Sequence, residues 1–149
     1  MTTKETSTVE HNQLSKFVGD WSTEGKISAT DTTPEIKISG TDTYEWLPGK
    51  FFLLHKANVL IGEEKSETYE VIGFDKHLGK YTMQHYDNKG NSGFMTATYI
   101  NQIWEFLGEN LKFTGGFKKE NNEFSGIWEQ SEDGNNWTHF MDIKLTKFK

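Results

Sequence analysis

Hydrophobic and polar residues alternate with a period of two along most of the chain after Trp21. This alternation predicts β-strands that have one face in a core and the other in solvent. Turn residues such as Gly, Asn, Asp and Pro divide the alternating region into ten segments: 21–30, 35–46, 51–61, 66–75, 80–87, 93–100, 102–107, 111–117, 123–131 and 136–147. The short stretches between them predict hairpins, and therefore an antiparallel meander.

Ten strands linked by hairpins leave two exposed sheet edges unless the sheet closes on itself. We therefore expect one all-β domain over residues 1–149, a closed antiparallel β-barrel of about ten strands. Two packed sheets are the alternative. Residues 1–6 are polar and are expected to form a loose tail.

A short helix is predicted before the first strand, because four apolar residues fall at helical spacing: Leu14, Phe17, Val18 and Trp21. Ser7 and Glu10 have the spacing of a capping box, and Gly19 is placed to end the helix. A helix of this length is not stable alone, so we expect its apolar face to cap one open end of the barrel. His11 is expected to be exposed on this helix, and His77 to lie in a turn.

The alternation also predicts which side chains point into the barrel. In the last segment these are Trp137, His139, Met141, Ile143 and Leu145. His55 and His85 fall on the apolar faces of their own segments, and Met83 lies on the same face as His85. Asp42 also falls on an apolar face, where a buried carboxylate needs hydrogen-bond partners.

The amino-acid composition excludes several classes of binding partner and site. The net charge is −6, with acidic and basic residues interspersed, which argues against nucleic acid and anionic membranes as partners. There is no Cys, so disulfides and thiolate metal sites are excluded, and every basic residue is Lys. No apolar stretch is long enough to insert in a membrane. We therefore expect a soluble, cytoplasmic protein.

Several stretches resemble a known family, in this order along the chain: residues 17–21, 40–51, 73–75 and 133–141. They are similar to a family of small bacterial lipocalin-like proteins, catalogued as domain of unknown function 1579, and the likeness extends from Leu14 to Lys147. The resemblance implies a lipocalin-like, calycin-like barrel, and it implies no particular activity.

The Gly19-Asp20-Trp21 element also resembles the opening motif of true lipocalins, in which the Trp closes one barrel end against a basic side chain. Because Arg is absent, Lys144 or Lys147 would have to take that place. Nitrobindin, a haem-binding barrel, opens in a similar way. That second resemblance implies haem as an alternative ligand, with His139 bound to the iron.

We expect the barrel to bind a small, largely apolar molecule, with histidines orienting its polar group. The predicted ligand-binding residues are Trp46, His55, Met83, His85, Trp128, His139 and Met141. Gly19 and Trp21 are predicted to be structural. For the histidines and tryptophans, simple core packing is the competing interpretation. No catalytic residue, metal site or resident cofactor is predicted, so a binding protein is favoured over an enzyme.

A third interpretation concerns the outer face of segment 51–61, which is itself partly apolar through Phe52, Leu54 and Leu60. Such a face could bury against a partner protein or a second copy of the chain. The protein would then be an interaction module or a homodimer rather than a carrier of a small molecule.

Overall fold

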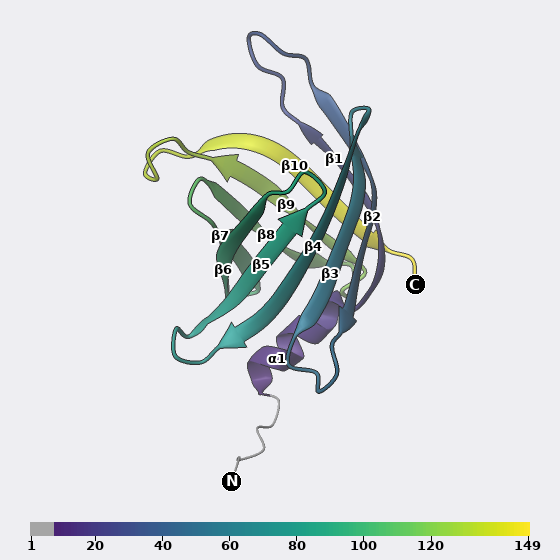
Figure 1. Ribbon diagram of the computed structural model, residues 1–149, viewed down its shortest axis with the longest axis vertical. Helices are drawn as coiled ribbons and strands as arrows, with labels where there is room; N and C mark the ends of the chain where they lie inside the picture. The colour runs from purple at the N-terminus through teal and green to yellow at the C-terminus, as the bar shows by residue number, and fades with distance from the viewer. Residues whose placement is uncertain (1–7) are drawn as a thin grey trace.

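The computed structural model describes residues 8–149, which form a closed barrel of ten antiparallel strands with a short helix below it (Figure 1). The elements are α1 (Val9–Leu14), the 3₁₀ turn η1 (Ser15–Phe17), β1 (Gly19–Ile27), β2 (Ile36–Trp46), β3 (Leu53–Ile61), β4 (Glu64–Asp75), β5 (Lys80–Asp87), β6 (Ser92–Ile100), β7 (Ile103–Leu107), β8 (Leu111–Lys118), β9 (Glu123–Gln130) and β10 (Thr138–Lys147). The expected fold is confirmed. The tail expected at residues 1–6 lies outside the described residues.

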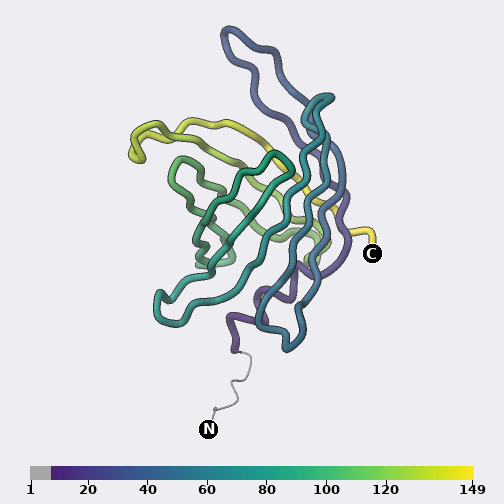
Figure 2. The backbone as a smooth tube through the Cα atoms, viewed as in Figure 1, coloured from purple at the N-terminus to yellow at the C-terminus, as the bar shows by residue number. Residues whose placement is uncertain are grey.

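Each strand pairs with its neighbours in the chain, and β1 pairs with β10 to close the sheet. The closing register runs from Trp21 opposite Lys147 to Ile27 opposite Met141. Figure 2 follows the chain as it passes up and down around the barrel. Because the ring is complete, no strand among residues 8–149 is left with an unpaired edge.

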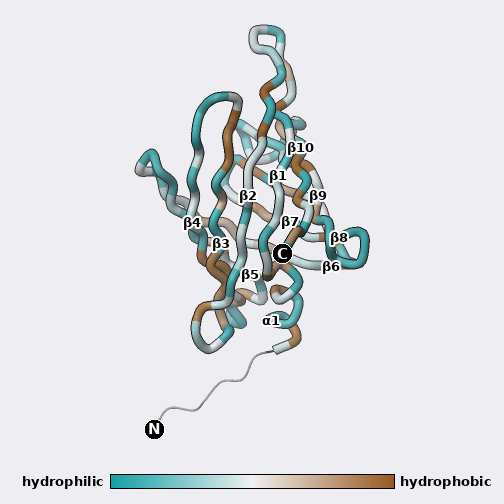
Figure 3. Tube along the Cα trace, turned by 90° about the vertical axis from the view of Figure 1, so that its right-hand side faces the viewer, coloured by the Kyte–Doolittle hydropathy of each residue, from teal (hydrophilic) through white to brown (hydrophobic). Residues whose placement is uncertain are grey.

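The strands follow from the alternation in the sequence. On β2, Ile38 and Tyr44 are buried, whereas Lys37, Thr41 and Glu45 are exposed. In Figure 3 the hydrophobic stretches lie along the strands, and the tip of the β3–β4 hairpin is hydrophilic. Within residues 8–149, no helix reaches the length and apolarity needed to span a bilayer.

The start of the helix differs from the sequence prediction. Thr8 is the N-cap, and its backbone N–H donates to Nδ1 of His11 at 3.0 Å. The capping box of this helix is thus formed by Thr8 and His11, and Ser7, the N-cap predicted from the sequence, lies outside the described residues. The expectation that His11 is exposed is wrong, since its ring is buried against Phe51 with centroids 5.4 Å apart.

The helical segment ends at Phe17, and Gly19 is already the first residue of β1. Gly19 has a φ of 140°, a conformation that favours glycine, and a Cβ there would lie 3.1 Å from the carbonyl oxygen of Lys149. Gly19 therefore permits the sharp change from helix to strand. It belongs to the strand rather than to the helix end.

Phe17 and Trp21 seal the end of the barrel that α1 covers. The Phe17 ring contacts Tyr44, Trp104 and two further rings, with centroids 4.8–5.3 Å apart. Trp21 is fully buried, and its indole N–H donates to the carbonyl oxygen of Phe17 at 2.8 Å. Of the two lysines expected to pair with Trp21, Lys147 is the one that lies over its ring, at 4.9 Å.

We predict that Trp21→Ala lowers the free energy of unfolding by about 3–5 kcal/mol, because it leaves a large cavity and removes a buried hydrogen bond. Urea denaturation measures the change. The matched control is Trp137→Ala, since the Trp137 ring is only half-buried and lies against Lys112. We expect that control to cost less than about 1 kcal/mol. Equal losses in the two variants would contradict the sealing role of Trp21.

Candidate functional site

The part of the barrel that α1 does not fill holds a cavity of about 420 Å³. One side of its wall is formed by aromatic and thioether side chains, chiefly Met83, Met95, Phe106, Phe113, Phe124, Trp128 and Met141. Its polar lining residues come from β1 to β4 and are Thr23, Asp42, Tyr44, His55, Ser66, Thr68 and Glu70. The cavity therefore has an apolar side and a polar side.

The strand register generates the polar side. Tyr44 on β2 is directly opposite His55 on β3, His55 is opposite Glu70 on β4, and Glu70 is opposite His85 on β5. Residues that are directly opposite on antiparallel strands share a face and lie close together. We call these four residues the polar row. Asp42, two positions before Tyr44 on β2, points to the same face and joins it.

His55 is held between two carboxylates. Its Nε2 lies 2.6 Å from Oδ2 of Asp42, and its Nδ1 lies 2.9 Å from Oε1 of Glu70. The hydroxyl of Thr23 donates to the other Asp42 oxygen. The ring of Tyr44 stacks on the imidazole at 4.1 Å with an interplanar angle of 8°. The expectation that a buried Asp42 needs hydrogen-bond partners is thus confirmed.

This environment sets the protonation of His55. Burial alone lowers its pKa, but the hydrogen bonds to Asp42 and Glu70 and the negative charges of these groups outweigh burial and raise the pKa to about 9. At neutral pH both ring nitrogens therefore donate. Burial, together with the charges of Asp42 and Glu70, raises the pKa of Tyr44 well above its ordinary value, which keeps its phenol neutral.

His85 extends the polar row without completing it. Its Nδ1 is buried, lies 3.9 Å from Oε2 of Glu70, and has no hydrogen-bond partner within the described part of the chain. The ring lies over Gly93, where a Cβ would come within 2.7 Å of Nε2 and Cε1. Any larger residue at that position would require this ring to shift.

The predicted ligand-binding residues have different placements. Four of them line the cavity: His55, Met83, Trp128 and Met141. His85 is not itself a lining residue and lies beside one of them, Glu70. Trp46 is half-buried and packs against the hydrophobic core, and it is not among the lining residues.

The inward orientation predicted for His139 is wrong. Its side chain is 40% exposed and contacts Oγ of Ser28 at 2.9 Å and a carboxylate oxygen of Asp142 at 3.1 Å. The cause is an irregularity in the pairing of β10 with β9 between His139 and Met141, which breaks the period of two. Phe140 and Met141 consequently both line the cavity. Trp137, also predicted to point inward, precedes β10 and is not a lining residue.

Sequence reasoning missed Glu70 and Thr23 as members of the site. The alternation in the sequence could have shown that Glu70 points inward, because Glu70 is two positions before the buried Ile72 on β4. Its importance depends on the register that sets it opposite both His55 and His85. No three or more His, Asp or Glu side chains in the described part of the chain could hold a metal ion.

We predict that His55 stabilises the fold in a pH-dependent way. Its pKa in the folded state is about 9, above the ordinary 6.5, so its contribution is complete below about pH 6.5 and is lost as the pH rises through 9. The expected loss is on the order of 3 kcal/mol. Urea denaturation across this range measures it, and an imidazole NMR titration of His55 locates the midpoint.

His55→Gln should remove this pH dependence, whereas His139→Gln, at the exposed histidine, should retain it. A midpoint for His55 near the ordinary value, or a slope that persists in His55→Gln, would contradict the assignment.

Comparison with known proteins gives the fold and a family. The crystal structure of Rv2717c from M. tuberculosis superposes with a TM-score of 0.65 over 97% of this chain and 100% of that one, at 10% sequence identity. That identity supports a shared fold alone. No curated protein matches the sequence. The model of the family described as "Protein of unknown function (DUF1579)" matches residues 6–109, and the chain belongs to this family.

Proposed function

We propose that this protein binds a small, largely apolar molecule inside the barrel, with the polar row orienting the polar group of the ligand. The observation that carries the proposal is a cavity of about 420 Å³ with an apolar side and a polar side. Binding sites for small molecules are commonly apolar pockets that contain a few placed polar groups.

The apolar side offers a surface for a flat or branched hydrocarbon. Phe113 stacks on Phe106 with centroids 4.8 Å apart and contacts Trp128 at 5.3 Å, so these rings support one another. Met83 and Met95 add flexible thioethers that adapt to the shape of a ligand. The combination suits an apolar body whose shape is not tightly specified.

The polar side is held in place before any ligand arrives. His55 is fixed by Asp42 on one nitrogen and Glu70 on the other, and Tyr44 stacks on its ring. A site whose polar groups are already ordered loses less conformational entropy when it binds. This favours recognition of a polar group at a defined position.

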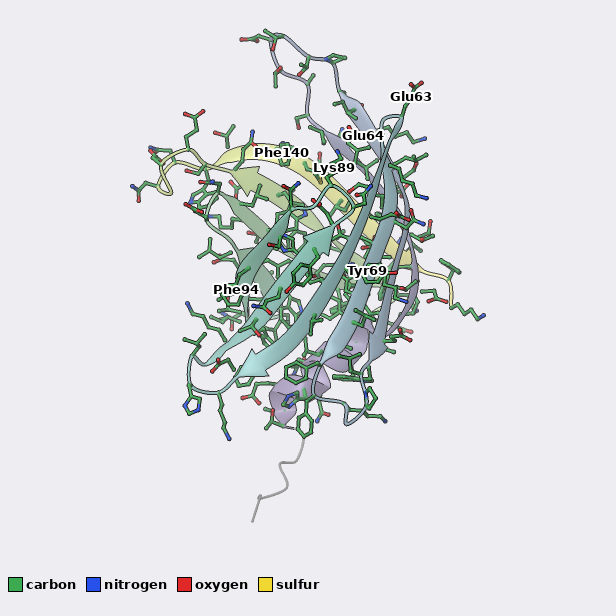
Figure 4. All side chains as sticks on the ribbon, in the orientation of Figure 1. Glu63, Glu64, Tyr69, Lys89, Phe94 and Phe140 are labelled. Atoms are coloured by element: carbon green, nitrogen blue, oxygen red, sulfur yellow. The ribbon has the colours of Figure 1, made fainter. Side chains whose placement is uncertain are left out.

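A ligand would enter from the rim opposite α1, because Phe17 and Trp21 seal the other end. Phe140, a lining residue, lies at that upper end on β10 (Figure 4). An ion pair between Glu64 and Lys89 ties the β3–β4 hairpin to the β5–β6 hairpin there.

The haem alternative is not supported by the placement of the histidines. His139, its expected iron ligand, faces solvent, and both ring nitrogens of His55 are engaged by carboxylates. The partner-protein alternative keeps some support, since Phe52 and Leu60 are 49% and 46% exposed on the outer face. It involves a surface separate from the cavity, so a small ligand would not compete with it.

We predict that Val59→Trp abolishes binding of a neutral fluorescent probe such as N-phenylnaphthylamine. Val59 lines the cavity, and an indole there would occupy the space. The control is Asn58→Trp, one residue earlier on β3 and exposed on the outer face. Fluorescence titration should show saturable binding in the wild type and in Asn58→Trp only. Equal binding in both variants would place the probe outside the barrel.

A further inference from the structure

We propose that the ligand is an amphiphilic amine, whose ammonium group binds between Glu70 and His85 and whose apolar body fills the aromatic side of the cavity. This inference rests on the proposed function and adds the chemical class of the ligand and the position of its polar group.

The charges around the cavity favour a cation. Its lining includes two carboxylates, Asp42 and Glu70, against one imidazole, His55, and no lysine. With Asp42 and Glu70 ionised, His55 protonated and the neighbouring His85 neutral, these side chains carry one net negative charge in a space that is mostly apolar. An uncompensated charge is costly in such surroundings, and a bound cation would offset it. A ligand with a carboxylate would add to the excess.

The geometry locates the binding point for this cation. Oε1 of Glu70 lies against His55, whereas Oε2 faces Nδ1 of His85 at 3.9 Å. That distance is too long for a direct hydrogen bond, and a donor that lies to one side of the line joining the two atoms could contact both at ordinary hydrogen-bond distances. The buried Nδ1 has no other partner among residues 8–149. This gap is the least satisfied point of the polar row.

An ammonium group suits the gap better than a hydroxyl. It carries three N–H donors, so it can donate to Oε2 of Glu70 and also to Nδ1 of His85 in the tautomer that accepts there. A hydroxyl has a single proton to donate and carries no charge. The positive charge of the ammonium is also attracted directly to the Glu70 carboxylate, an attraction that a neutral hydroxyl lacks.

The other polar atoms are less suited to anchor the ligand. Asp42 accepts from Thr23 on one oxygen and from His55 on the other. Tyr44 is covered on one face by the His55 ring. On Glu70, by contrast, only Oε1 is hydrogen-bonded to His55, and Oε2 lies 3.9 Å from His85. The position of Glu70 opposite both histidines directs the ligand toward β5.

The test uses three ligands with one apolar body: phenylbutylamine, phenylbutanol and phenylbutanoate. Isothermal titration calorimetry of the wild-type protein at neutral pH should show the amine binding about tenfold or more tightly than the alcohol, the effect of one charged hydrogen bond. The carboxylate should bind more weakly than the alcohol. This ranking of the three affinities is measured on the wild-type protein alone, so it does not depend on whether a variant folds.

Glu70→Gln then tests the position, because it retains the shape and one oxygen acceptor but removes the charge. Amine affinity should fall by about tenfold, while alcohol affinity should change less than about twofold. The matched control is Glu67→Gln on the same strand. Glu67 does not line the cavity, and its carboxylate lies 3.4 Å from the ammonium group of Lys65. This control should leave all three affinities unchanged. Circular dichroism checks that each variant is folded.

Each negative result of these titrations contradicts a different part of the proposal. If the alcohol or the carboxylate binds as tightly as the amine, the amine proposal is overturned and the binding function stands. If the amine binds best but Glu70→Gln leaves its affinity unchanged, the position between Glu70 and His85 is overturned. If neither the three ligands nor the neutral probe binds, the proposed function itself is overturned.

Discussion

The pairing of β1 with β10 is the constraint on which the rest of this structure depends. Closure removes both sheet edges and gives each of the ten strands one inward face. The enclosed space must then be packed with side chains or left open. Phe17 and Trp21 fill it at the helix end, while the other end keeps a cavity of about 420 Å³. The seal and the cavity are thus two results of one closed sheet.

The same pairing register concentrates chemistry on one side of the cavity. His55, Glu70 and His85 are consecutive partners across β3, β4 and β5, so three ionisable side chains must share a small volume. Compared with apolar side chains of similar size, a buried imidazolium between two carboxylates adds little stability, because removing these charges from water costs about as much as their attraction returns. Stability is lost at high pH because the imidazole gives up its proton while the two carboxylates remain. We therefore regard the polar row as a feature of recognition, and the hydrophobic seal around Trp21 as the source of stability.

The sequence predicted more of the fold than of the site. The period of two located ten strands, and a closed sheet followed from their short connections. The identity of the site depended on register, which no single strand reveals: Glu70 matters only because it faces His55 and His85. His139 was misplaced because one irregularity in β10 reverses the alternation. Thr8 and His11 form the cap through a histidine side chain, which the usual Ser–Glu pattern does not describe.

The most direct test of this account is a crystal structure of the protein with phenylbutylamine. The account predicts the ligand inside the barrel, with its nitrogen within hydrogen-bond distance of Oε2 of Glu70 and Nδ1 of His85, and with its ring against Phe113 and Trp128. A ligand on the outer face, or an interior in which side chains close the cavity, would contradict the central claim that the barrel is a binding site organised by the polar row.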